Sequence, residues 1–139
     1  MAAILKSGLR IMPHSGGRVG KGIYLADCHE KSAGYAGSAQ GTTIMFLVEA
    51  ALGKQCEIVN DDHTLTSAPN GFDSVLAKGR IAPSSDGDVE LRIDKKPVKV
   101  CSKNPESVAS AQNSSFHHNE FLIYKESQHR IRYILTFDN

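Results

Sequence analysis

The sequence predicts an α+β domain built mainly from antiparallel strands, with few short helices. Two observations carry this prediction. Short runs rich in β-branched and aromatic residues recur along the chain, and turn residues separate them. Helical signals, in contrast, appear only near the N-terminus. At 139 residues the chain is long enough for one domain or part of one, and a hydrophobic content of 40% is enough for a modest core.

The N-terminal segment predicts a helix end, an extended piece and a loop. Residues 1–6 are typical of the end of a helix, with Gly8 as its C-terminal stop. Because no capping residue comes first, we expect the chain to begin inside a larger domain. Residues 9–12 form a short extended piece, and the glycines of residues 13–22 predict a loop.

One helix and one long apolar run follow this loop. Residues 23–26 predict a short strand, and Asp27 is a suitable N-cap for a helix that we place at residues 28–35. The most apolar run, residues 42–59, is β-branched at both ends and predicts a long core strand with a bend at Gly53.

The C-terminal half alternates strands with turns. "FDSVLAKG" predicts a short strand, "VELRI" and "KPVKV" predict a hairpin across "DKK", and residues 103–119 predict a loop. The last segment predicts two strands joined by a tight turn at "ESQH". Alternation along the final strand predicts two faces: Ile131, Tyr133 and Leu135 against Arg130, Arg132 and Ile134.

Composition excludes several classes of function. A net charge of +1 gives no strong electrostatic case for a nucleic-acid or acidic-lipid partner. No apolar run approaches the length of a membrane span, so we expect no membrane contact. The three cysteines (Cys28, Cys56 and Cys101) are an odd number without a C-x-x-C pair, which predicts free thiols.

The glycine-rich loop does not fit the known phosphate-binding patterns. A P-loop fails because Ser15 and Gly22 occupy positions that require glycine and serine or threonine. A dinucleotide fingerprint fails because Leu25 stands at its last glycine position. A mobile loop and a ligand-contacting loop both remain open.

Two tyrosines flank the predicted helix. Tyr24 lies on the short strand before it and Tyr35 at its end, so together they can sandwich a flat ring. Ser32, between them, carries a hydroxyl that can bond an amide at the ring edge. Alternatively, both tyrosines are core residues with hydrogen-bonded hydroxyls.

Glu120 is the acidic residue that opens an apolar strand. Period-two alternation places it on the face of Leu122 and Tyr124. A carboxylate on an apolar face is costly unless it is paired, which makes Glu120 a functional candidate. The alternative is a solvated strand end.

We expect no metal site. Cys28 and His29, like His117 and His118, are adjacent pairs rather than residues at the spacing of metal ligands.

Several motifs together resemble one known family. "GLRIMP", "GKGIYLAD", "KSAGY", "EAALGK", "GFDSVLAKG" and "NEFLIYKESQHRIRYIL" are similar, in this order, to the catalytic domain of poly(ADP-ribose) polymerases. The loop "MPHSGGRVGKGIY" most resembles the mono-ADP-ribosylating branch of the DNA-break-responsive subgroup. The resemblance implies a split antiparallel β-sheet ADP-ribosyltransferase fold. It also implies NAD as the substrate, a protein or nucleic-acid acceptor, release of nicotinamide, and a nuclear role in DNA repair.

The resemblance also implies roles for single residues. Glu120 matches the catalytic glutamate. Tyr24 matches the tyrosine of the family's His-Tyr-Glu triad, and Tyr35 the tyrosine that stacks on nicotinamide. The remaining matches are Ser32 for the carboxamide, Lys31 beside it in the same pocket, and Arg10 near the adenosine half of NAD.

The sequence departs from the family in what it lacks. The triad histidine belongs to a His-Gly-Ser/Thr motif, and no "HGS" or "HGT" occurs here. We therefore expect residues 1–139 to be the N-terminally truncated, C-terminal portion of the catalytic domain, with any DNA contact made by upstream modules. Arg18 stands where chain-elongating members carry an apolar residue, which favours mono-ADP-ribosylation. The alternative is a truncated, inactive fragment that binds NAD, nicotinamide or a partner protein.

Overall fold

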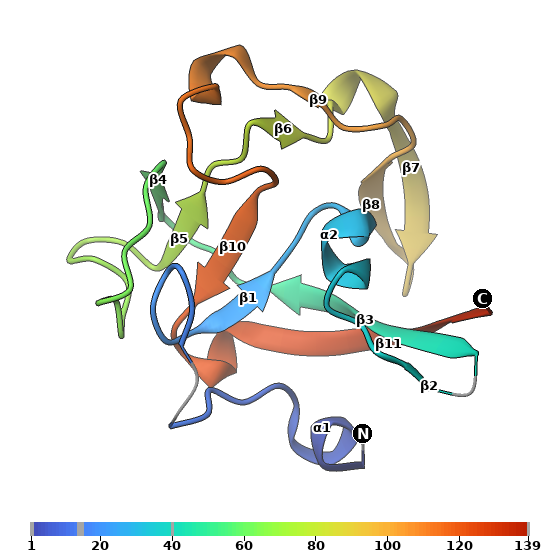
Figure 1. Cartoon of the computed structure of the whole chain (residues 1–139). Helices are drawn as coiled ribbons and strands as arrows, with labels where there is room; N and C mark the ends of the chain where they lie inside the picture. The colour runs from blue at the N-terminus through green and yellow to red at the C-terminus, as the bar shows by residue number, and fades with distance from the viewer. Residues whose placement is uncertain (1, 14–15, 40, 139) are drawn as a thin grey trace.

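Strands, most of them short, are the main regular secondary structure of the molecule (Figure 1). The computed structural model describes residues 2–13, 16–39 and 41–138. Within these ranges the two α-helices are α1 (Ala2–Ser7) and α2 (His29–Ala33). The strands are β1 (Ile23–Leu25), β2 (Ser38–Ala39), β3 (Thr42–Ala50), β4 (Gln55–Ile58), β5 (Ser74–Ala77), β6 (Ile81–Ala82), β7 (Asp88–Ile93), β8 (Lys96–Cys101), β9 (Glu106–Ser107), β10 (Glu120–Ile123) and β11 (His129–Asp138). Three 3-10 turns complete the chain: η1 (Ser85–Gly87), η2 (Ala109–Ala111) and η3 (Glu126–Gln128).

The strands form two principal sheets. The first has the order β1-β10-β5-β4, and the second has the order β11-β3-β2. Every pair in them is antiparallel except β4 and β5, which run parallel. Figure 1 shows α2 above β3, between β1 and the β7–β8 hairpin. The predicted α+β class with mainly antiparallel strands is confirmed.

The core lies against the first sheet. Its buried members are side chains of β5, β10 and the flanking loops: Val19, Val75, Ala77, Phe116, Leu122 and Tyr124. The Tyr124 hydroxyl donates a hydrogen bond to the carbonyl of Val19 at 2.9 Å, and burial raises the pKa of Tyr124. The strand that begins with Glu120 is therefore anchored in the best-packed part of the molecule.

The long apolar run is divided between the two sheets. Instead of one strand, residues 42–59 form β3 and β4, and Gly53 lies between them with a φ of 54°. The prediction of a bend at this glycine is confirmed, but the prediction of one core strand is wrong. β3 also carries exposed apolar side chains, such as Leu47.

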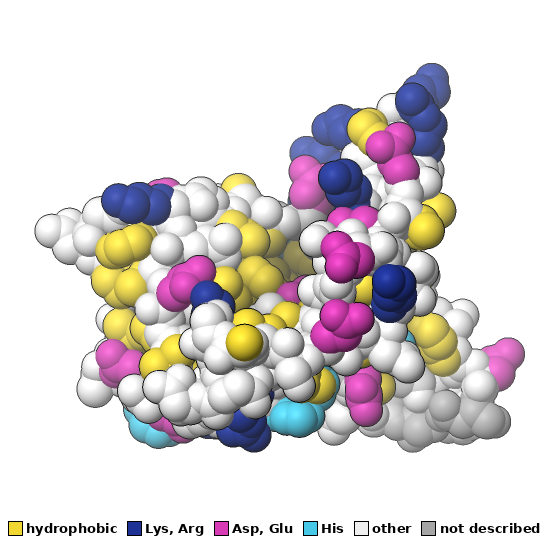
Figure 2. Space-filling model, turned by 90° about the horizontal axis from the view of Figure 1, so that it is seen from above, with side chains coloured by type: hydrophobic (Ala, Val, Ile, Leu, Met, Phe, Trp, Pro, Cys, Tyr) yellow, Lys and Arg dark blue, Asp and Glu magenta, His cyan; other side chains and the backbone are white. Residues whose placement is uncertain are grey.

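The hairpin prediction is confirmed. β7 and β8 pair in antiparallel register, and Asp94 and Lys95 form the turn with φ values of 50° and 64°. Positive φ at both central residues is typical of the type I′ turn, whose twist matches that of the flanking strands. Figure 2, seen from above, shows a projection with both acidic and basic side chains on the right, the side on which this hairpin lies in Figure 1. A hollow with hydrophobic side chains lies beside this projection.

The segment before β1 departs from the prediction in part. α1 ends before Gly8, which has a φ of 80°, as a C-terminal stop requires. Residues 9–12 form no strand in the described part of the chain; the Leu9 amide donates to Nε2 of His129 and the Ile11 amide to Oε1 of Glu126. The predicted loop follows, although its residues 14–15 lie outside the described part of the chain.

Other local predictions have mixed outcomes. Cys28, not Asp27, is the N-cap of α2, and no side chain caps this helix end. Asp27 instead accepts a hydrogen bond from Asn119.

The predicted turn between the last two strands is η3. All three cysteines are free, as predicted. Neither described helix is long and apolar enough to cross a membrane.

Candidate active site

Glu120 is a buried carboxylate at the end of a central strand. It opens β10, which has β1 on one side and β5 on the other, and the residue is only 5% exposed. The alternative of a solvated strand end is therefore wrong. Burying a carboxylate without a partner is costly, so its surroundings must stabilise it.

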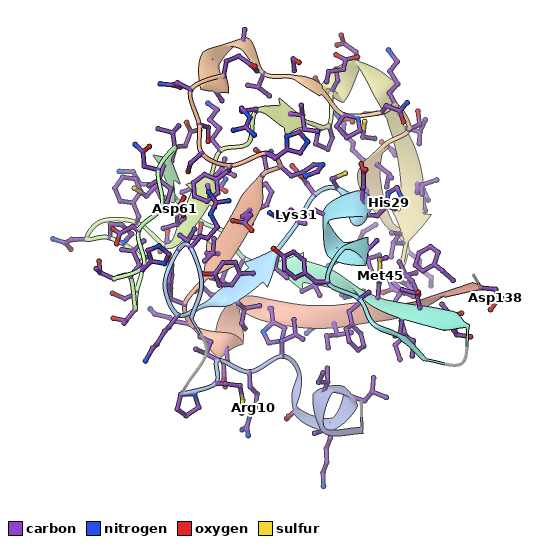
Figure 3. All side chains as sticks on the ribbon, viewed as in Figure 1. Arg10, His29, Lys31, Met45, Asp61 and Asp138 are labelled. Atoms are coloured by element: carbon purple, nitrogen blue, oxygen red, sulfur yellow. The ribbon has the colours of Figure 1, made fainter. Side chains whose placement is uncertain are left out.

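Lys31 provides the partner of Glu120. Its Nζ atom lies 2.7 Å from Oε1 of Glu120, and both side chains are largely buried. Lys31 belongs to α2, and Figure 3 shows it on the side of this helix that faces β1 and β10. The second carboxylate oxygen, Oε2, is buried and has no hydrogen-bond partner among the described residues. The pair thus holds one oxygen of the carboxylate and leaves the other one without a described partner.

Asn119 fixes the backbone just before Glu120. Its Oδ1 accepts a hydrogen bond from the Gly79 amide at 2.8 Å, and its Nδ2 donates to Asp27 at 2.8 Å. Burial raises the pKa of Asp27, although the bond from Asn119 opposes this change. Gly79 permits the close approach, because a Cβ there would lie 2.3 Å from the carbonyl carbon of His118. Sequence patterns gave no sign of this support.

Tyr24 lies on the same face of the sheet as Glu120. It pairs with Leu122 across β1 and β10, and cross-strand partners point to one side, as do residues two apart. The Tyr24 hydroxyl donates to the carbonyl of Gly20 at 2.7 Å and accepts from the Val19 amide at 3.1 Å. Burial raises the pKa of Tyr24, and the nearby charge of Glu120 adds to this effect. With 36% of the residue exposed, Tyr24 combines a fixed hydroxyl with an accessible ring.

Tyr35 is an exposed aromatic residue at the end of α2. It is 82% exposed, so the alternative that it belongs to the core is wrong. Tyr35 adds slightly to the raised pKa values of Tyr24 and Arg18. Ser32, one turn earlier, is half-buried, and its hydroxyl makes no hydrogen bond within the described part of the chain. Both groups are thus free to contact a ligand.

Arg10 lies apart from this group. Figure 3 shows it on the loop after α1, on the other side of β1 and β11 from Lys31. Its side chain is exposed. The structure therefore brings Glu120, Lys31, Tyr24, Ser32 and Tyr35 to one region and leaves Arg10 outside it.

Arg18 borders the site from the glycine-rich loop. Its guanidinium donates two hydrogen bonds to Asp61, at 2.8 and 2.7 Å, and lies over the ring of Phe116 at 4.5 Å. This pairing raises the pKa of Arg18, to which Glu120 also contributes, and lowers the pKa of Asp61 to about 2. These contacts fix Arg18, in the described part of the loop, next to the site.

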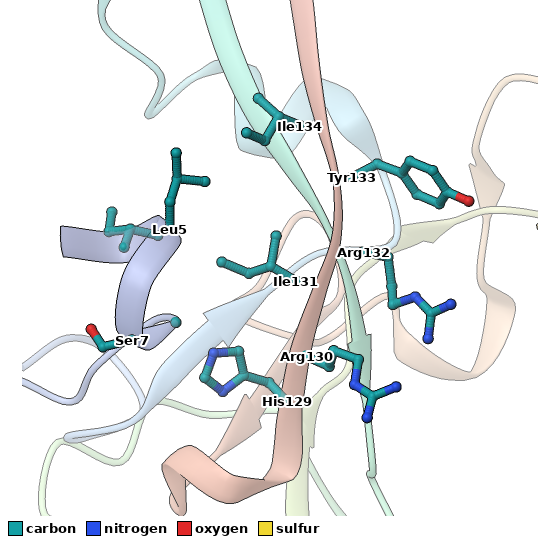
Figure 4. Close-up of a pocket in the computed structure, with 10 residues that line it drawn as sticks. Leu5, Ser7, His129, Arg130, Ile131, Arg132, Tyr133 and Ile134 are labelled. Carbon is teal, nitrogen blue, oxygen red and sulfur yellow. The ribbon is translucent and has the colours of Figure 1, made fainter. Parts of the chain in front are cut away.

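A separate groove lies between α1 and β11, with a volume of ≈ 440 Å³ (Figure 4). In that view Ile131 and Ile134 point towards α1, whereas Arg130, Arg132 and Tyr133 point away. The predicted alternation is therefore wrong from Tyr133 onwards. The reason is a register shift between Ile131 and Tyr133, which places an extra residue in β11. None of the predicted site residues lines this groove.

Comparison with known proteins identifies the class of fold. Residues 1–139 match the family model described as "Poly(ADP-ribose) polymerase catalytic domain". The chain therefore belongs to this family.

Individual relatives fall into two groups. The chain is 54% identical over 136 residues to "Protein mono-ADP-ribosyltransferase PARP3" of Gallus gallus and 50% identical over 139 residues to the Homo sapiens protein of that name. It is 37% identical over 141 residues to "Poly [ADP-ribose] polymerase 2-B" of Oryza sativa. These matches cover 97% of this chain but only 26%, 26% and 23% of the relatives, so the chain spans about a quarter of their length.

Proposed function

We propose that this chain supplies the glutamate-bearing part of an NAD-dependent ADP-ribosyltransferase. The enzyme cleaves the bond between nicotinamide and ribose in NAD and transfers ADP-ribose to a protein acceptor. One observation supports this most strongly: a buried carboxylate, Glu120, is held through one oxygen by Lys31 and has its other oxygen free of described partners. An unpaired buried acceptor of this kind suits a substrate hydroxyl.

The free oxygen of Glu120 has a defined task in this proposal. As nicotinamide departs, positive charge develops on the ribose, and the Glu120 carboxylate stabilises it while accepting a hydrogen bond from the ribose 2′-hydroxyl. The same carboxylate can take a proton from the attacking acceptor. Lys31 acts as a positioning residue, because its ammonium fixes the carboxylate orientation through Oε1.

The aromatic residues hold the leaving group. Tyr35 stacks on the nicotinamide ring, Tyr24 lines the other side, and the Ser32 hydroxyl bonds the carboxamide. The exposure of the Tyr35 ring and the unengaged Ser32 hydroxyl support these roles. Arg10 contacts the adenosine half, a role proposed from the family resemblance, because the structure places Arg10 apart from the other site residues.

In this proposal, a segment upstream of these 139 residues completes the active site. We infer that residues 1–139 are the C-terminal portion of the catalytic domain and that an upstream segment supplies the triad histidine. Supporting this, the chain covers 26% of its PARP3 relatives and contains no His-Gly-Ser or His-Gly-Thr motif. Mono-ADP-ribosylation, a nuclear location and a role in the DNA damage response are proposed from the same similarity, with DNA contacted by upstream modules.

Release of nicotinamide from NAD tests the proposal. It should be measured for the 139-residue chain and for a form extended at its N-terminus through the triad histidine. We expect release by the extended form and little or none by the short chain. Binding of NAD without cleavage by the extended form would instead support a non-enzymatic binding module.

A further inference from the structure

Three side chains of the kinds that bind metals meet at the N-terminal end of α2. They are Cys28, Glu30 and His118, and their ligand atoms all lie within 4.8 Å of one another. Spacing along the chain gave no sign of this cluster, because the fold brings the start of α2 to the segment just before β10. Cys28 is buried and unpaired, whereas Glu30 is exposed.

His118 points to a missing ligand. Its Nε2 atom is buried and has no hydrogen-bond partner among the described residues. The Oε2 atom of Glu30 lies 4.0 Å away, beyond hydrogen-bonding distance. Buried polar atoms are normally satisfied, so a nitrogen without a partner beside a thiol and a carboxylate needs an explanation.

The His118 ring is also fixed in place by its neighbour. It packs edge-on against the ring of His117, with the two ring centroids 4.6 Å apart.

We propose that Cys28, Glu30 and His118 form a three-ligand site for Zn²⁺, with a fourth position open to water. A thiolate, a carboxylate and a neutral imidazole are all accepted by Zn²⁺, and their total charge of about −2 balances the ion. Mg²⁺ and Ca²⁺ are disfavoured, because they require oxygen ligands.

The three ligand atoms need to move only slightly closer together to bind zinc. Bond lengths of about 2.0–2.3 Å place tetrahedral zinc ligands roughly 3.3–3.6 Å apart. The present separations reach 4.8 Å. Glu30 can supply the movement, because its side chain is 73% exposed and nothing buried holds it in place. Cys28 and His118 provide the fixed part of the site.

The ion would join two segments that carry the candidate active site. α2 has five residues and no side-chain cap at its start, so it is too short to be stable alone. Zinc bound by Cys28 and Glu30 would fasten this helix, with Lys31 and Ser32, to His118, two residues before Glu120.

Cobalt binding tests the site directly. The chain is stripped with a chelator under reducing conditions and titrated with Co²⁺, which substitutes for Zn²⁺ and reports a bound thiolate by a charge-transfer band in the near ultraviolet. We expect such a band at one equivalent, its loss on adding one equivalent of Zn²⁺, and release of a proton from the thiol.

Variants assign the ligands. Cys28→Ser should abolish the band, and His118→Gln and Glu30→Gln should each weaken Co²⁺ binding by at least about 10-fold, as for losses in other metal sites. Cys101→Ser and His63→Gln, at positions outside the cluster, are matched controls and should bind like the wild type. Circular dichroism confirms folding of each variant, and Glu30→Gln, at an exposed position, tests the site even if Cys28→Ser does not fold. Absence of the band in the wild type, or an unchanged band in folded Cys28→Ser, overturns the proposal.

Discussion

The ammonium of Lys31 lies 2.7 Å from Oε1 of Glu120, and the two side chains are 16% and 7% exposed. This contact joins α2 to the central strand β10. Removing one partner of such a pair destabilises the folded protein strongly, because the other charge is left buried and uncompensated. It is both the structural link between the two elements and the device that orients the proposed catalytic carboxylate.

Lys31→Met should therefore destabilise the chain strongly. We expect a loss of about 3–5 kcal/mol in the free energy of unfolding, as for other buried pairs that lose one partner. Denaturant unfolding measures it. Adding Glu120→Gln to Lys31→Met should restore part of the loss, since the uncompensated charge is removed. Lys78→Met breaks the more exposed pair with Glu57 and should cost only about 0–1 kcal/mol. Equal losses in the two single variants would contradict the importance of burial.

Tyr35→Ala should weaken ligand binding without affecting stability. The ring is 82% exposed, so its removal leaves no cavity. Loss of a stacking contact of about 0.5–1.5 kcal/mol predicts roughly 2- to 13-fold weaker binding of nicotinamide. Chemical-shift titration measures the affinity, and Tyr35→Phe should retain it. A lowered Tm together with unchanged binding would show that Tyr35 has a structural role instead.

Gly17→Ala should displace Tyr24. A Cβ at Gly17 would lie 2.6 Å from the Tyr24 hydroxyl, whereas one at Gly16 meets nothing within 4 Å. The hydroxyl would then lose its hydrogen bonds to the loop, and nicotinamide binding should weaken. Gly16→Ala is the matched control and should bind like the wild type. If both variants bind equally well, Tyr24 does not line the binding site.

The stabilisation contributed by the Arg18–Asp61 pair should be lost in acid. Its hydrogen bond from Arg18 lowers its pKa from 3.8 to about 2. Because the folded pKa is the lower one, the stabilisation is present above the unfolded pKa and is lost as the pH falls through the folded value. Asp61→Asn should thus lower the Tm slightly at neutral pH, by a few degrees at most for an exposed pair. The difference from wild type should vanish between about pH 4 and pH 2. A difference between Asp61→Asn and wild type that stays constant from pH 7 to pH 2 would refute this assignment.

Local patterns predicted the elements better than their arrangement. The β7–β8 hairpin followed from a turn signal between two short strands, and the end of α1 followed from Gly8. These features depend on neighbouring residues only. The parallel pairing of β4 with β5 and the bulge in β11 depend on contacts between distant segments, which alternation cannot show.

The same distinction holds for the site. Alternation singled out Glu120 as an unusual carboxylate on an apolar strand, and its burial agrees with that view. The support from Asn119 and Asp27, and the approach of His118 to Cys28, arise from segments far apart in the sequence. Motif spacing finds sites built within one segment and misses those assembled by the fold.

The most direct test of the account compares the N-terminally extended protein with its Glu120→Gln variant. The amide keeps the size of the side chain but removes the charge that would stabilise the ribose cation. It also leaves Lys31 without its partner, so circular dichroism must first show that the variant is folded. We expect nicotinamide release from NAD to fall by about 10²–10³-fold, the usual cost of losing one such electrostatic contact, while the Kd for NAD changes little. Release by the variant at the wild-type rate would contradict the catalytic role of Glu120.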